Sequence, residues 1–168
     1  MAGAARVGRA AGVVGLVALT FFAWRLWFTG EEGVIRRRLE ALRDEINLGV
    51  ADGLENAVRA AAIGSFFTDD VLVDLGQGTA AINGRETVMG MAARLQPRTA
   101  AFKLEVQDIG VTMRPGNTIS DVTLTGTFIR RSITTGEESI DAREFALVMT
   151  KADGTWRISR LTAVDTLK

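Results

Sequence analysis

The hydrophobic pattern divides the chain into two parts. Residues 10–24 carry no charge, and residues 26–28 extend this apolar run past Arg25. A helix needs about 20 apolar residues to cross the hydrocarbon core of a bilayer, so the run predicts one transmembrane helix. The pattern that follows is that of a soluble domain. We therefore expect a tail and membrane anchor over residues 1–30 and a single domain over residues 31–168.

The residues that flank the apolar run favour an anchor that is not cleaved. Residues 21–28 are bulky where a signal peptidase requires small side chains. Trp24 and Trp27 are typical of a membrane interface, with Arg25 reaching the lipid headgroups between them. A removable signal peptide is the alternative interpretation of the same segment.

Charges on the two sides of this segment bear on its orientation. Arg6 and Arg9 precede it and favour a cytoplasmic amino terminus, whereas residues 36–38 and Arg43 place arginines on the opposite side. We expect a single-pass protein of the bacterial inner membrane with its domain on the periplasmic side.

The first half of the domain has helical periodicity. Thr29-Gly30-Glu31-Glu32 has the spacing of a capping box and predicts a helix start. Apolar residues then recur at intervals of three and four. Gly49 to Gly53 interrupts the pattern, and a second helix with a small apolar face follows. The first face consists of Val34, Ile35, Leu39, Leu42 and Ile46, and the second of Leu54, Ala57, Val58, Ala61 and Ala62.

The second half alternates between apolar and polar residues, which is typical of strands. We expect short strands over 71–75 and 80–82, a helix over 85–95, and then four long strands. Their turns are expected at 114–117, 134–137 and 152–155. Half-polar alternation of this kind suits an antiparallel sheet with one covered face.

This order of elements resembles the nuclear transport factor 2-like superfamily, which includes polyketide-cyclase-like and ketosteroid-isomerase-like proteins. Three segments carry the resemblance: 66–71 at the first strand, 82–88 at the third helix, and 153–158 at the last hairpin. The resemblance implies an α+β cone in which three helices pack on a curved antiparallel or mixed sheet. Here one transmembrane helix would precede the cone. The superfamily hosts enzymes, binding modules and assembly domains, so it does not imply one function.

Composition argues against catalysis. The chain has no cysteine, histidine or tyrosine, whereas catalytic members of the superfamily typically pair an aspartate base with a tyrosine or histidine. We expect no catalytic residue, cofactor or metal. Nucleic-acid binding is not expected either, because residues beyond 30 hold 17 basic and 20 acidic side chains.

Two sets of residues remain candidates for a site. Asp69, Asp70 and Asp74 form the densest carboxylate cluster, which could hold a base or a hard cation but is favoured as the polar start of a strand. A second set could line an apolar pocket, although residues of this kind are more often core. Its members are Phe66, Asp74, Met89, Phe102, Phe128 and Trp156.

Two arginine clusters each allow two interpretations. Residues 36–38 are either the solvated face of a helix with local ion pairs or a contact with anionic headgroups. Arg130 and Arg131 are expected to pair with Glu137, Glu138 and Asp141 across a short hairpin, with a partner-binding patch as the alternative.

The function that these patterns favour is non-catalytic. We expect a membrane-anchored accessory or assembly subunit of a larger membrane protein complex, of respiratory, photosynthetic, secretion or transport type. Its partners would be the lipid bilayer and an integral membrane protein complex. The alternative is a membrane-tethered pocket protein that binds or transforms a small apolar ligand by carboxylate chemistry.

Overall fold

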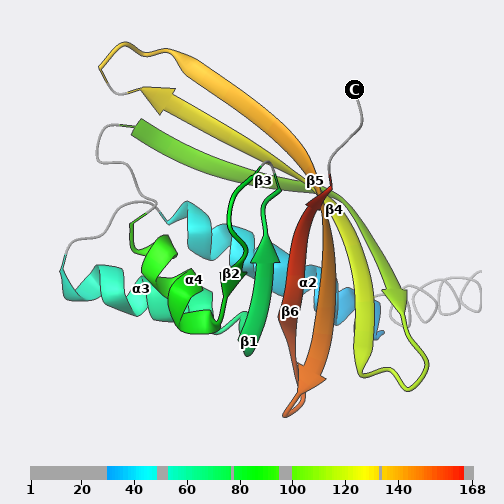
Figure 1. Ribbon diagram of the computed structural model, residues 1–168. Coiled ribbons are helices and arrows are strands. Elements are labelled where there is room, and N and C mark those ends of the chain that lie inside the picture. Colours follow the sequence, from blue (N-terminus) through cyan, green and yellow to red (C-terminus); the bar gives the residue numbers. More distant parts are fainter. Residues whose placement is uncertain (1–29, 49–52, 77, 95–99, 133, 165–168) are drawn as a thin grey trace, which may run out of the picture. The chain divides into compact units, whose positions relative to one another are not determined.

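The computed structural model describes residues 30–48, 53–76, 78–94, 100–132 and 134–164 (Figure 1). The chain forms two compact units, residues 1–34 and residues 35–168. The described part of the first unit is the start of helix α2, where Glu31 and Glu32 lie in the first turn. The predicted anchor, with Trp24, Arg25 and Trp27, lies outside the described residues. Among the helices that are described, none is both long and apolar enough to cross a membrane.

The predicted order of elements is confirmed. A six-stranded sheet has the strand order β2-β1-β6-β5-β4-β3, in which β1 and β6 are parallel and the other neighbours are antiparallel. The elements are α2 (Glu31–Asn47), α3 (Leu54–Gly64), β1 (Phe67–Asp74), β2 (Ile82–Asn83), α4 (Arg85–Ala92), β3 (Ala100–Met113), β4 (Ile119–Ser132), β5 (Glu138–Ala152) and β6 (Thr155–Val164).

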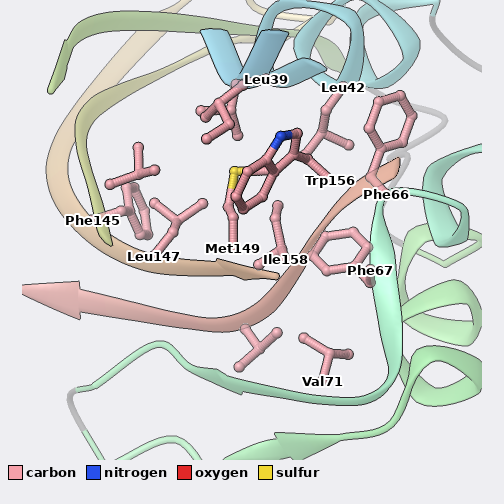
Figure 2. Close-up of a cluster of buried hydrophobic side chains, with 13 residues drawn as sticks. Leu39, Leu42, Phe66, Phe67, Val71, Phe145, Leu147, Met149, Trp156 and Ile158 are labelled. Atoms are coloured by element: carbon pink, nitrogen blue, oxygen red, sulfur yellow. The ribbon is translucent and has the colours of Figure 1, made fainter. Parts of the chain in front are cut away.

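Helix α2 covers one face of the curved sheet (Figure 1). Ile35, Leu39 and Leu42 are its buried residues, and their spacing places them on one side of the helix. In Figure 2 Leu39 and Leu42 lie over Trp156, which comes from β6. Ile46 also packs against the core, so the predicted apolar face is the packed face except for Val34, which is exposed.

Strand pairing brings the other half of the core together. Met149 lies opposite Ile158, and Leu147 opposite Leu161, so their side chains share the face beneath α2. Figure 2 shows the labelled side chains from β1, β5 and β6 converging on this layer. Ser120 on β4 is a buried polar residue opposite Met149, and its hydroxyl donates to the Thr112 carbonyl at 3.1 Å. Satisfying that hydroxyl removes most of the cost of burying it.

The end of α2 is tied to the edge strand β3. The Asn47 side-chain amide donates to the Leu104 carbonyl at 2.8 Å and accepts from the Leu104 N–H at 2.7 Å. These two bonds occupy backbone groups of β3 that point away from β4. An edge strand otherwise leaves such groups open to pairing with another chain, so Asn47 both protects the edge and fixes where the helix ends.

Helix α3 is oriented differently from what its apolar pattern suggests. Leu54, Ala57, Val58 and Ala61 are exposed, while Ala60 and Gly64 are buried. The reason is close packing, because a Cβ atom on Gly64 would lie 2.5 Å from the Met89 Cγ of α4. Ala60, Gly64 and the partly buried Ile63 therefore face the protein, whereas Leu54 and Val58 face solvent.

Smaller differences concern element boundaries. Strand β1 begins at Phe67 rather than at residue 71, and a register shift against β6 between Phe67 and Leu72 accommodates the exposed Asp69 and Asp70. The second strand is reduced to two residues, Ile82 and Asn83.

Replacing Trp156 tests whether the layer beneath α2 is a packed core. Trp156 is 1% exposed, and truncating a buried aromatic residue to alanine costs about 3–5 kcal/mol. We expect Trp156→Ala to lower the free energy of unfolding by about 3–5 kcal/mol. This loss should appear as a lower denaturant midpoint with an unchanged slope of the transition. Val164→Ala, on the same strand but 42% exposed, should change stability by about 0.5 kcal/mol or less. Equal effects of the two substitutions would contradict a packed layer.

Candidate functional site

The structure distributes the six pocket candidates over different layers of the domain. Phe66 and Trp156 belong to the core cluster. Figure 2 shows both side chains next to Leu42 and Phe67. The Arg38 guanidinium also stacks on the Phe66 ring, 4.0 Å from its centroid. Phe66 therefore contacts core residues on one side and Arg38 on the other, and both contacts are structural.

Met89 and Asp74 lie away from the covered face of the sheet. Met89 is on α4 and packs against Gly64 of α3. Asp74 follows Val73, which shares the core face with Leu161. Because successive strand residues point to opposite faces, Asp74 is on the other face. Its Oδ1 accepts from the Gly76 N–H at 2.9 Å, which stabilises the turn after β1.

The other two aspartates of the carboxylate cluster are at the surface. Asp69 is 88% exposed and forms an ion pair with Arg85 at 2.6 Å, and Asp70 is exposed. Among the described residues, no three histidine, cysteine or acidic side chains are grouped so that they could hold a metal ion. Asp69 alone of the three is seen to link β1 to the start of α4, through Arg85.

Phe102 and Phe128 are the two candidates that come together. Their ring centroids are 6.1 Å apart, and Phe128 meets Phe145 edge-on at 6.0 Å. Phe102 and Phe128 are partly exposed, whereas Phe145 is buried. We call these three residues the aromatic cluster. It lies on the covered face of the sheet, near the Leu104 position at which Asn47 ends the cover provided by α2.

One ion pair accompanies the aromatic cluster. Arg143 Nε donates to Asp141 Oδ2 at 3.0 Å. Asp141 lies opposite Phe128, and Arg143 lies opposite Gly126, so both side chains share the face of the rings. The pair was not among the pocket candidates from the sequence, because only the strand register reveals that it adjoins the rings. This end of the face thus combines apolar rings with one cation and one anion.

Arg114 and Asp121 form another exposed ion pair. Arg114 donates to both carboxylate oxygens of Asp121, and this lowers the pKa of Asp121. Both side chains are exposed at the β3–β4 turn. The pair therefore stabilises this turn.

The arginines of residues 36–38 differ from both interpretations that the sequence allowed, a solvated helix face or a contact with lipid headgroups. Arg38 is not a solvated residue of a helix face, because its Nη2 donates to the Ser65 carbonyl at 3.0 Å and its guanidinium stacks on Phe66. Arg36 donates to the Ile109 carbonyl on β3. Both side chains therefore fasten α2 to its neighbours, which sequence spacing along one helix does not reveal. In the other cluster, Arg131 pairs with Glu138 at 3.7 Å as expected.

Comparison with solved structures identifies the fold. An NTF2-like protein with a cystatin-like fold from Novosphingobium aromaticivorans is 15% identical, with a TM-score of 0.65 over 89% of this chain and 92% of that chain. A ketosteroid isomerase-like protein from Erwinia carotovora atroseptica is 17% identical, with a TM-score of 0.57 over 84% and 100%. The domain has a nuclear transport factor 2-like fold.

A third similar structure is a candidate calcium/calmodulin dependent protein kinase II association domain from Xanthomonas campestris. It is 13% identical, with a TM-score of 0.60 over 79% of this chain and 87% of that chain. No protein-family model and no curated protein matches the chain. Identities at this level establish the fold and leave the activity open.

Gly126→Ala tests the geometry of the aromatic cluster. A Cβ atom at Gly126 would lie 2.9 Å from Phe145 Cε2, so the ring must move and Phe128 with it. We expect a loss of about 1–3 kcal/mol in the free energy of unfolding, together with shifts in the NMR signals of both rings. Gly90→Ala is the control, because its Cβ meets nothing within 4 Å and alanine favours the helix. A neutral Gly126→Ala variant would contradict this arrangement.

Proposed function

We propose that the protein is a non-catalytic, membrane-anchored accessory subunit of a larger membrane protein complex. We further propose that the exposed face of α3 is the surface that binds its partner. Leu54, Ala57, Val58 and Ala61 form this face, which we call the α3 stripe. The observation that carries the proposal is the exposure of the stripe, because Leu54 is 82% and Val58 61% exposed.

The spacing of the α3 stripe supports recognition by another helix. Its positions follow the i, i+3, i+4, i+7 pattern of a helix that binds in a groove. The two alanines permit close approach of a partner backbone, as small residues do between helices in membranes. Isolated exposed apolar residues are common on protein surfaces, but four on one side of one helix form a continuous surface.

The opposite side of α3 holds the helix in place without using the stripe. Asn56 donates to the Ala93 carbonyl at 3.3 Å, and Arg59 donates to the Leu48 carbonyl at 3.0 Å. Ala60 and Gly64 are buried. Helix α3 is therefore attached to the domain through its other side, and a partner on the stripe would displace none of these contacts.

The proposed anchor supports the same role. Only Thr29 and Gly30 separate the apolar run, which ends at residue 28, from the first residue of α2. A domain restricted to the membrane surface has a high effective concentration for partners in the same membrane. A modest interface such as the α3 stripe is then sufficient for stable association.

The experiment uses the tagged full-length protein, extracted from its native membrane with a mild detergent, sized, and analysed by mass spectrometry. We expect integral membrane proteins to co-migrate with the wild type and to be lost from the Leu54→Ser/Val58→Ser variant. Deletion of residues 1–28 should also abolish the complex. Ile140→Ser is the matched control, since Ile140 is an exposed apolar residue on β5, and Asp74→Asn should likewise leave the complex intact. Retention of the complex by the double variant would refute the α3 stripe as the interface.

A second candidate function rests on the aromatic cluster. Phe102 and Phe128 are partly exposed beside the Asp141–Arg143 pair, and this combination suits a small apolar ligand with one polar group. The resemblance in fold to a ketosteroid isomerase-like protein is compatible with such a site. In the same experiment, a protein that migrates alone and carries a bound apolar molecule would favour this candidate.

A further inference from the structure

An arginine on β4 adjoins the aromatic cluster. Phe128 and Arg130 are two residues apart on this strand, so their side chains point to the same face of the sheet. Arg130 lies opposite Phe102 on β3, and residues that lie directly opposite each other have Cβ atoms about 4.5–5.5 Å apart. Arg130 is therefore a neighbour of both partly exposed rings of the cluster.

The pattern of backbone hydrogen bonds brings Arg130 and Phe102 close together. Asn47 occupies the N–H and carbonyl of Leu104, so these groups point away from β4 and Leu104 forms a non-hydrogen-bonded pair with Phe128. An antiparallel ladder repeats every two residues, so the Phe102–Arg130 pair is of the same kind. Side chains approach each other most closely in pairs of this kind.

No carboxylate compensates for the charge of Arg130 within the described residues. Its opposite residues on the two neighbouring strands are uncharged, Phe102 and Ser139, and none of the ion pairs in this part of the chain includes it. The acidic side chains of the β4–β5 hairpin have other partners, which are Thr135 for Glu137, Arg131 for Glu138 and Arg143 for Asp141.

The Asp141–Arg143 pair borders the same site without adding net charge. Its two side chains share the face of the rings, and the 3.0 Å ion pair neutralises Asp141. Asp141 therefore neither compensates Arg130 nor places an uncompensated negative charge beside it. This end of the face offers two partly exposed rings and one net positive charge.

We propose that this end of the sheet binds a small molecule that has an apolar body and one terminal carboxylate. The apolar body packs on Phe102 and Phe128, and the carboxylate accepts hydrogen bonds from Arg130, whose planar guanidinium suits both carboxylate oxygens. One carboxylate matches one uncompensated guanidinium, whereas a phosphate monoester carries a charge of about −1.5 to −2. This inference rests on the second candidate function and names the class of its ligand, and it is independent of the α3 stripe.

The test uses the full-length chain in a neutral mild detergent and follows its thermal unfolding midpoint at constant ionic strength. Phenylbutyrate supplies an aromatic body with a carboxylate, and phenylbutanamide has the same body without the charge. A ligand that binds only the folded state raises the midpoint with concentration. We expect phenylbutyrate to do so with an apparent affinity at least about tenfold higher than that of phenylbutanamide. Arg130→Gln should remove this difference by weakening the binding of phenylbutyrate alone.

Arg131→Gln is the matched control, because Arg131 is the next residue on β4, is exposed, and points to the other face of the sheet. It should respond as the wild type does. Equal affinities for the two ligands, a preference retained in Arg130→Gln, or equal weakening by both substitutions overturns the carboxylate site but leaves apolar binding at the aromatic cluster in place. No response to either ligand overturns the carboxylate site and the second candidate function together. Circular dichroism of each variant before titration verifies that it is folded.

Discussion

The packing of α2 on the sheet is the interaction on which the rest of the domain depends. Ile35, Leu39 and Leu42 meet a layer that includes Met149 and Trp156, and each large side chain buried there contributes about 1.5–3 kcal/mol. A six-stranded sheet needs a cover on its apolar face. Because α2 provides that cover with side chains, the candidate sites lie at the margins of the sheet, on α3 and at the aromatic cluster.

The sequence predicts the elements well because their periods are local properties. Alternation in β4 and β5 follows directly from one buried and one exposed face, and Asp153-Gly154 marks the turn between β5 and β6. The orientation of α3 was not predictable in the same way. Its apolar pattern indicates a face but does not say whether the protein or a partner covers it, and the close approach of Gly64 to Met89 depends on tertiary structure.

The candidate site was harder to predict, for a related reason. Phe66, Trp156, Phe102 and Phe128 have the same apolar character in sequence, yet the first two are core and the last two remain partly exposed. The two pairs differ in whether α2 covers them. The position at which α2 ends decides this, and the Asn47–Leu104 hydrogen bonds fix that position. The contact of Arg38 with Phe66 likewise joins segments that no periodicity relates.

Hydrogen exchange of the α2 amides tests most directly whether this helix is a permanent cover rather than a lid over a cavity. Core elements exchange only through global unfolding, whereas lids open at a lower free energy. We expect the amides of residues 39–46 to exchange as slowly as those of Leu147 and Met149, with the same dependence on denaturant. Faster exchange confined to α2, with β5 still protected, would show that α2 is a lid and would identify the covered face of the sheet as a ligand cavity.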